Sequence, residues 1–248
     1  TNDHLIALEA LEKIYAEGRE LESLLEIYSR RANLAQREDR RDDGQRRQYL
    51  ILAADLCERE LGRGDEAISL LEQVLQIFPS DVESATALER LYKNSLRWAD
   101  LADLLERRLK YASADSEVVD LRYRLGVLFE EELQSPDRAV ENYRLALGVD
   151  SEHEPSISAL ERFLGDADQR VTAAWVLKPI YEKRGAWMKL IRTHEIHLYA
   201  ADDSEKRIEF TKAIAALYEE KVLDVGQAFG WYGKVFVLQP GDGWTRDQ

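Results

Sequence analysis

Apolar residues recur every three or four positions along the stretch 87–150, and polar residues fill the positions between them. One stripe in the middle of this stretch consists of Leu121, Leu125, Leu128, Phe129 and Leu133. Such spacing is typical of an α-helix with one buried face. The stretch therefore predicts four amphipathic helices separated by short turns, with Phe129 in the core that they share.

The same periodicity continues on both sides and predicts about thirteen helices in all. We expect them near residues 3–17, 19–36, 46–62, 65–78, 80–95, 98–112, 117–134, 136–148, 155–164, 168–184, 187–201, 205–222 and 225–238. Ser80, with Glu83 three residues later, is the expected start of one helix, and Ser135-Pro136-Asp137 is the expected start of another. The pattern is that of an all-α protein.

The helical segments also repeat within the chain, which points to stacked structural units. Ala139 aligns with Ala67 at an offset of 72 residues, and neighbouring positions align at the same offset. A third copy aligns at an offset of 89 residues, with Trp187 on Trp98. The three copies are expected at roughly 3–80, 81–152 and 176–240, and the extra residues are assigned to an inserted helix at 165–181.

Composition and charge narrow the possible partners. The 13 Gly and 5 Pro are few for a sheet-rich chain of 248 residues, which agrees with helices. A formal net charge of −14 disfavours nucleic acid, whose binding depends on clustered Lys and Arg, and would attract a basic protein segment. No apolar run is long enough to span a membrane. Cys57 is the only cysteine, so no intramolecular disulfide can form, and a reducing compartment, the cytoplasm, is favoured.

Small and aromatic residues in the third and fourth helices of the stretch resemble the signature of a tetratricopeptide repeat. The residues concerned are Leu125-Gly126, Phe129, Ala139, Tyr143 and Ala146. The intervening hairpins carry a second phrase, A-L-E-x-[LI]-Y followed by a turn and W-x-x-L. This alternation is similar to long tetratricopeptide-like scaffold proteins of bacteria, although Ser151 stands where the family has a closing proline.

The resemblance implies a right-handed α-solenoid of antiparallel hairpins, forming one domain over 1–240, with 241–248 as the start of a further helix or a disordered tail. In that family the first helix of each hairpin lines a concave groove. The groove positions carried onto this sequence are Asp120, Tyr123, Arg124, Val127, Glu130 and Glu131 in one hairpin, Glu83, Arg90, Lys93 and Asn94 in its neighbour, and Asp55, Glu58 and Arg59 in the first copy. The alternative is that these mixed, somewhat acidic residues form a solvated face without a ligand.

His194 and His197 are the best candidates for a metal site, because residues three apart share one face of a helix. Their spacing differs from that of the His-Glu-x-x-His zinc helix. In the repeat alignment His194 falls on Leu105, a packing position, and His197 falls on Arg108 beside it. A metal-dependent activity at this pair is the least favoured function, and no cofactor is predicted.

Aromatic residues divide into expected core residues and one candidate for binding. Trp98, Trp187 and Trp175 are expected in the core, as is usual for aromatic residues at helical spacing. Trp231 aligns with a polar residue, Asn142, so part of its ring is expected at the surface as a binding anchor. Cys57 aligns with Phe129 and is expected to be a buried filler.

These features favour a protein–protein interaction scaffold without catalysis, which binds another protein on its curved repeat surface. The alternative is a rigid spacer within a longer repeat array, in contact with other copies or flanking domains. A nucleic-acid role would require one face to concentrate the arginines near the predicted charged loop. Those residues are Arg30, Arg31, Arg37, Arg40, Arg41, Arg46 and Arg47, and acidic residues lie between them.

Overall fold

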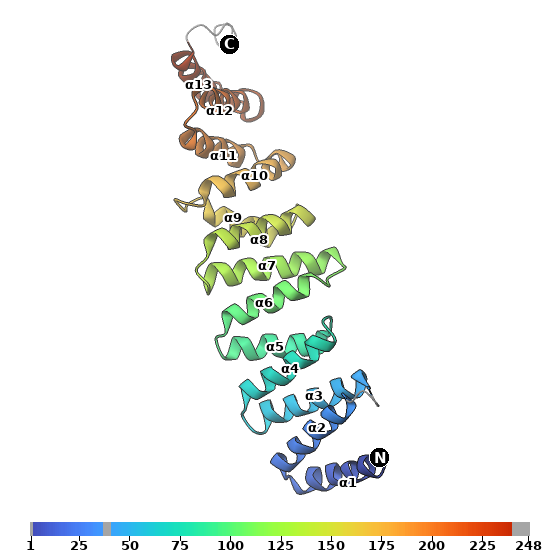
Figure 1. Ribbon diagram of the computed structural model, residues 1–248. Helices are drawn as coiled ribbons and strands as arrows, with labels where there is room; N and C mark the ends of the chain where they lie inside the picture. Colours follow the sequence, from blue (N-terminus) through green and yellow to red (C-terminus); the bar gives the residue numbers. More distant parts are fainter. Residues whose placement is uncertain (1, 37–40, 240–248) are drawn as a thin grey trace. The chain divides into compact units, whose positions relative to one another are not determined.

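A computed structural model describes residues 2–36 and 41–239, and all regular structure in these residues is helical (Figure 1). Across the described residues there are thirteen α-helices and one π-helical turn, which confirms the predicted class and number of helices. The chain divides into two compact units, Thr1–Ser113 and Ala114–Gln248. The single domain over 1–240 and the right-handed curvature stay predictions, and the expected helix or tail at 241–248 lies outside the described residues.

The first unit contains six helices, each packed on the next along the chain (Figure 1). They are α1 (Asn2–Gly18), α2 (Leu21–Ala35), α3 (Asp43–Arg59), α4 (Gly64–Ile77), α5 (Val82–Asn94) and α6 (Trp98–Leu109). Asp81 begins α5, because its side chain accepts a hydrogen bond of 2.9 Å from the backbone N–H of Ser84. The prediction that Ser80 begins this helix was wrong: the carboxylate one residue later is the cap.

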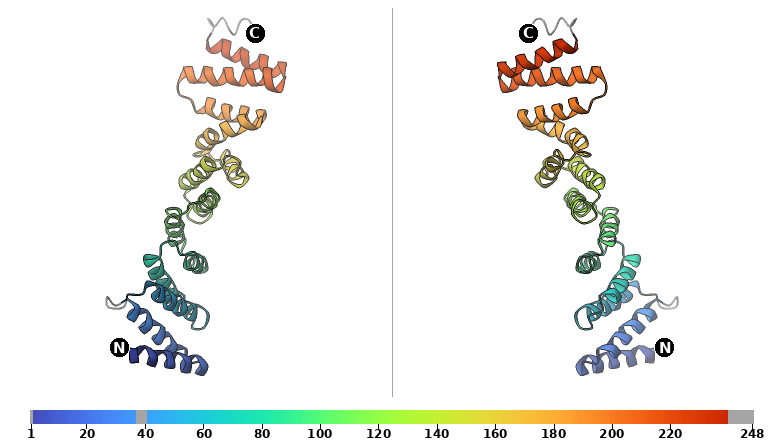
Figure 2. Two further views of the ribbon diagram at one scale, coloured as in Figure 1. Left: turned by 90° about the vertical axis from the view of Figure 1, so that its right-hand side faces the viewer. Right: turned by 90° about the vertical axis from the view of Figure 1, so that its left-hand side faces the viewer.

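The second unit contains seven α-helices, again packed in chain order. They are α7 (Asp115–Glu131), α8 (Pro136–Val149), α9 (Glu154–Phe163), α10 (Arg170–Arg184), α11 (Trp187–Ala200), α12 (Ser204–Leu217) and α13 (Val225–Leu238), with the π-helical turn Tyr218–Val222 before α13. Figure 2 shows the last two helices lying side by side. Pro136 occupies the first position of α8 as predicted, because proline lacks the N–H that would be unpaired there.

Each unit has its own apolar core, built from the stripes predicted by the sequence. Phe129 is 1% exposed and Cys57 is fully buried, which confirms both as core residues. Gly126 lies directly against Tyr143: a Cβ atom at this position would stand 2.6 Å from Cδ1 and 2.8 Å from Cζ of the ring. Glycine is thus required where α7 and α8 approach each other.

Four buried or half-buried tyrosines tie neighbouring helices together by donating a hydrogen bond to a glutamate. The pairs are Tyr92 with Glu72 (2.6 Å), Tyr143 with Glu130 (2.7 Å), Tyr181 with Glu161 (2.8 Å) and Tyr232 with Glu219. Burial, followed by the hydrogen bond to the carboxylate, raises the pKa of each tyrosine above its usual value. The first and third pairs lie 89 residues apart, as do the second and fourth, which is the offset between the second and third predicted copies.

Two expectations about tryptophans were wrong. Trp231 is only 6% exposed, because it shares the inward face of α13 with Ala228, Tyr232 and Val235 and packs against the core around Ile214. It therefore offers no exposed binding anchor. Trp175 was expected in the core but is 51% exposed on α10, while Trp98 and Trp187 are half-buried.

Candidate interaction grooves

A groove of about 480 Å³ crosses the first unit between α3 and α5, and we call it the α3–α5 groove. Ile51 and Ala54 of α3, Leu71 of α4, and Val82 and Ala87 of α5 contribute its apolar surface. Its charged lining is Asp55, Glu58, Arg59, Glu83 and Arg90. The structure therefore brings two predicted site residues, Glu83 and Arg90, together with the three predicted equivalents on α3.

The charges around this groove are paired within the chain. Arg90 Nη2 lies 2.6 Å from Glu58 Oε2, and Arg59 Nε lies 2.6 Å from Asp55 Oδ1. Glu83 is contacted at 2.8 Å by Arg47, outside the lining. Three carboxylates and two guanidinium groups leave the lining with a formal charge of −1, so the groove is apolar at its floor and slightly acidic at its rim.

The other two candidates on α5, Lys93 and Asn94, are exposed but do not line this groove. They follow Tyr92, whose side chain points into the core, and lie in the last turn of the helix. A role for them in binding a partner protein stays a prediction.

The predicted residues on α7 lie in the second unit and have mixed roles. Glu130 is half-buried and accepts hydrogen bonds from Tyr143 and, at 2.8 Å, from Arg162 of α9. This Arg162–Glu130 pair lies 72 residues beyond the Arg90–Glu58 pair. The ion pair between α3 and α5 in the first unit therefore recurs between α7 and α9 in the second. Glu130 is thus engaged in holding α7, α8 and α9 together.

The remaining α7 candidates surround this bridge. Tyr123 packs edge-on against His153, with ring centroids 5.4 Å apart. Asp120 and Arg124 form an exposed pair at 3.5 Å, Val127 is half-buried, and Glu131 is exposed. Asp120 and Glu131 are the most exposed of the α7 set, whereas Tyr123 and Glu130 contact neighbouring helices.

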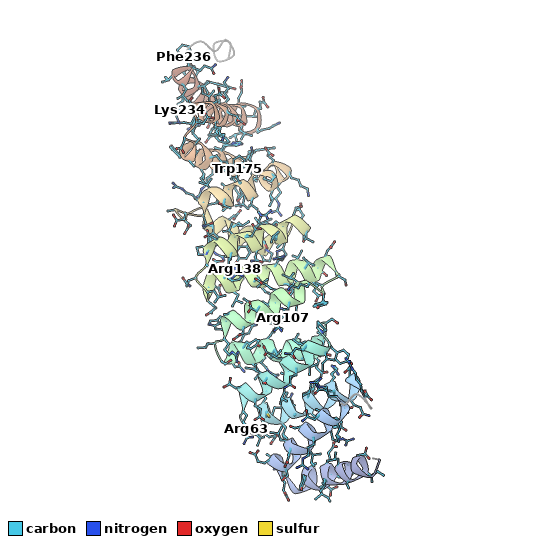
Figure 3. All side chains as sticks on the ribbon, in the orientation of Figure 1. Arg63, Arg107, Arg138, Trp175, Lys234 and Phe236 are labelled. Atoms are coloured by element: carbon cyan, nitrogen blue, oxygen red, sulfur yellow. The ribbon has the colours of Figure 1, made fainter. Side chains whose placement is uncertain are left out.

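A second groove, of about 590 Å³, lies over α8 and α10 in the second unit, and sequence reasoning missed it. We call it the α8–α10 groove. Trp175, Val176 and Pro179 of α10 and Leu147 of α8 form its apolar surface, with Arg144 and Lys183 among its polar lining residues. Figure 3 labels Trp175 on α10. Among the described residues no carboxylate lines this groove, in contrast to the α3–α5 groove.

The two grooves occupy related positions in the sequence. At the offset of 89 residues, Thr86 of α5 corresponds to Trp175 of α10 and Arg90 to Pro179. Tyr92 of α5 and Tyr181 of α10 also lie 89 residues apart, and each donates a hydrogen bond to a glutamate of the preceding helix. Related positions of α5 and α10 therefore line a slightly acidic groove in one unit and a groove with Arg144 and Lys183 in the other.

One histidine of the pair on α11, His197, contacts Trp175, which lines this second groove. His197 is 2% exposed and stacks on Trp175 with ring centroids 4.1 Å apart, while His194 packs against Phe210 of α12. Burial first, and then the charge of Lys178, lowers the pKa of both imidazoles to about 4. The expectation that His197 flanks the core was wrong, because Trp175 covers it.

These histidines lack the surroundings of a zinc site. Within the part of the chain that the structure describes, no group of three or more His, Cys, Asp or Glu side chains is arranged to hold a metal ion. Zinc sites in proteins generally use three or four protein ligands, so two buried imidazoles beside aromatic rings do not fit one.

Of the five described arginines near the charged loop, four pair with acids and Arg46 is half-buried. Arg30 pairs with Glu26, Arg41 with Asp43, and Arg31 with Glu9 and Glu12. Arg47 bridges Asp81 and Glu83, whereas Arg37 and Arg40 lie outside the described residues. Phosphate contacts depend on cationic groups that a ligand can reach, so the paired arginines do not favour nucleic acid.

None of the described helices combines the length and the apolar character that crossing a membrane requires. No family model matches the sequence, and no curated protein matches it.

Similar solved structures include tetratricopeptide-repeat proteins. The C-terminal part of a TPR repeat-containing protein from Cytophaga hutchinsonii is 14% identical, with a TM-score of 0.38, covering 99% of this chain and 94% of its own. YrrB, described as a TPR protein with an unusual peptide-binding site, is 14% identical with a TM-score of 0.32, covering 87% and 96%. MamA is 14% identical with a TM-score of 0.34, covering 75% and 93%. At these scores the likenesses carry no argument, and the fold rests on the helices of this chain.

Proposed function

We propose that this chain is a tetratricopeptide-like interaction module, without catalysis of its own, that binds a segment of a partner protein in the α3–α5 groove. Its paired hairpins of about 72 residues, resembling those of bacterial scaffold proteins, present a preformed surface. The observation that carries the proposal is the groove of about 480 Å³ itself, which has an apolar floor and includes Glu83 and Arg90. A preformed surface reduces the cost of ordering on binding.

The partner segment is expected to be basic, with an apolar side chain that reaches the groove floor. Val82 is 63% exposed and lines this groove, so an apolar side chain of a partner can reach it. Asp55 and Glu83 form exposed pairs with arginines, and such pairs contribute little to stability, so a ligand cation can replace an internal partner at low cost.

The test is a pull-down from a lysate of the source cell at low and moderate salt, with mass spectrometry of the retained proteins. A specific partner should be retained by the wild type, weakened by salt, and lost with Val82→Glu. Asp55→Lys should weaken retention, because it reverses a charge at the rim. Tyr199→Glu is the matched control, since Tyr199 of α11 is 81% exposed and does not line this groove.

Retention that is unchanged by Val82→Glu would contradict the proposed groove. If the wild type retains nothing, or only other parts of a longer parent chain, the rigid spacer becomes the better function. That second candidate is favoured by the internal pairing of the charged groove residues, such as Arg90 with Glu58.

A further inference from the structure

A pocket of about 440 Å³ opens between α4 and α6 in the first unit, and we call it the α4–α6 pocket. Its lining includes the hydrogen-bonded pair of Tyr92 and Glu72. The other lining residues all belong to α6 and are Asp100, Asp103, Glu106, Arg107 and Lys110. Four carboxylates and two cations give the lining a formal charge of −2, and neither of the two grooves shares any of these residues.

The second unit contains a counterpart of this pocket. At the offset of 89 residues, helices α4, α5 and α6 correspond to α9, α10 and α11. Four residues of α4 align with identical residues of α9, namely Ile68, Ser69, Leu71 and Glu72. The hydrogen bond from tyrosine to glutamate is present in both units, as Tyr92 to Glu72 and as Tyr181 to Glu161. The two places are built alike, so a difference between them indicates what each can bind.

In the second unit a lysine side chain occupies this place. Lys189 of α11 holds its Nζ 2.6 Å from Glu161 Oε1 and 5.6 Å from the centroid of the Tyr181 ring. In the first unit the residue aligned with Lys189 is Asp100, a carboxylate. One unit therefore supplies its own ammonium group to the glutamate, whereas the other has an acid at that position.

Glu72 lacks a cation of its own. Within residues 2–36 and 41–239 it forms no ion pair, and the donor that contacts it is the neutral hydroxyl of Tyr92. Arg97 lies over the Tyr92 ring at 5.1 Å. Its guanidinium group, however, pairs with Asp100 at 2.7 Å and with Asp65 at 3.8 Å. A half-buried carboxylate is stabilised by an opposite charge within a few ångströms, so this pocket favours a cationic ligand.

Arg107 adds an unused hydrogen-bond donor to the same pocket. Its Nε is buried and has no hydrogen-bond partner among the described residues. Figure 3 labels this side chain on α6. An unpaired buried donor is costly, and a carbonyl oxygen can satisfy it. A lysine within a polypeptide offers both an ammonium group and backbone carbonyls, whereas a free polyamine carries no carbonyl.

We propose that the α4–α6 pocket binds a lysine side chain of a partner protein. The ammonium group of that lysine takes the place beside Glu72 that Lys189 takes beside Glu161, and Arg107 Nε donates to a backbone carbonyl of the same segment. The pocket shares no residue with the α3–α5 groove, so this proposal and the proposed function can fail separately.

Nuclear magnetic resonance titration of the complete, isotope-labelled chain tests the proposal, with a capped peptide that carries a single lysine between alanines. This peptide should shift the backbone signals of Asp103 and Arg107, whereas the same peptide with norleucine should not, because norleucine lacks the charge. Glu72→Gln should weaken binding by at least about 10-fold, the effect of losing one charge-assisted hydrogen bond, and it keeps an acceptor for Tyr92. Glu17→Gln removes the same charge from an exposed position on α1 and should bind as the wild type does.

Asp100→Lys gives the decisive result. It introduces the residue of the second unit, so the new ammonium group should occupy the pocket and abolish peptide binding. Asp100→Asn also removes the carboxylate but brings no ammonium group, and it should retain measurable binding. Val82→Glu alters only the α3–α5 groove and should leave binding unchanged.

Several results would overturn the proposal. One is a wild type that responds to neither peptide or to both alike, and another is unchanged binding by Glu72→Gln. A third is an equal response to cadaverine, a free diamine without the carbonyl that Arg107 is proposed to contact. Loss of binding with Val82→Glu would assign the lysine to the α3–α5 groove instead. If circular dichroism shows that Glu72→Gln is unfolded, Asp103→Asn replaces it, because Asp103 is exposed and lines the same pocket.

Discussion

Adding a methyl group at Gly126 is expected to destabilise the second unit, although alanine is the better helix former. An ideal Cβ at this position lies 2.6 Å from Cδ1 and 2.8 Å from Cζ of Tyr143, far inside the normal contact distance of about 3.5 to 4.0 Å between carbon atoms. The ring cannot simply move away. Tyr143 is fully buried, donates a hydrogen bond to Glu130, and packs against Tyr123 and Phe163.

The expected magnitude follows from two opposing effects. Overpacking a closely packed core costs roughly 1–3 kcal/mol, and the severity of this overlap puts Gly126→Ala at the upper end. The gain in helix propensity offsets up to about 1 kcal/mol. A net loss of about 2 kcal/mol in the free energy of unfolding is therefore expected.

Urea unfolding followed by far-ultraviolet circular dichroism measures this loss. Gly148→Ala is the matched control on α8, since a Cβ there meets nothing within 4 Å, and it should be neutral or stabilising. In a Tyr143→Val background the obstruction is gone, so Gly126→Ala should no longer destabilise, and the double-mutant cycle should show the coupling. If Gly126→Ala matches the control in the wild-type background, the close approach of α7 and α8 is refuted.

Three further changes test other parts of the structure. Phe129→Ala should cost about 3–5 kcal/mol in the same unfolding assay, and a loss below about 1 kcal/mol would contradict its place in the core. His194 and His197 should make the second unit less stable in acid: the unfolded chain binds their protons near pH 6.5 and the folded chain only near pH 4. Between these values the free energy of unfolding should fall by up to roughly 1.4 kcal/mol per pH unit for each histidine, and His197→Leu should reduce the pH dependence measured by thermal unfolding. Arg90→Ala should change stability by less than about 1 kcal/mol, because its bridge to Glu58 is partly solvated, and a larger loss would reveal a structural role.

Helix positions were accessible to sequence reasoning because hydrophobic spacing determines which face of a helix is buried. The predicted helices at 136–148, 187–201 and 225–238 agree with α8, α11 and α13 to within a residue at each end. Helix ends depend on finer chemistry. Ser80 and Asp81 are both good caps, and only the path of the backbone decides that Asp81 accepts the hydrogen bond.

The environment of the tryptophans was harder to predict, since it depends on neighbouring helices. Trp231 was aligned with Asn142, and the alignment itself was informative: Asn142 is buried, and its amide donates to the backbone of its own helix. A polar residue was mistaken for an exposed one. Trp175 had no counterpart in the prediction, because its helix was treated as an insertion. The 89-residue offset relates it to Thr86, and the Tyr92 and Tyr181 hydrogen bonds support that relation.

The sequence predicted which helices form the candidate site, but not which charged residues form ion pairs there. Residues 55, 58, 83 and 90 share one groove as expected, because equivalent positions of stacked hairpins face the same side. The pairing of Arg90 with Glu58 and of Arg47 with Glu83 could not be read from the sequence, since these residues lie about thirty or more positions apart. A long charged side chain can pair with several opposite charges, and the distance between the helices determines which of them it reaches.

The burial of Cys57 makes its labelling by a thiol reagent a measure of opening in the first unit. Its thiol is fully enclosed, and burial raises its pKa to about 11, so the native chain offers a thiol reagent neither access nor thiolate. Because it is the only cysteine, every labelling event reports an opening of α3 and its neighbours and none reports the second unit. The rate of labelling therefore reports openings of the first unit around Cys57, and anything that binds in the α3–α5 groove should slow it.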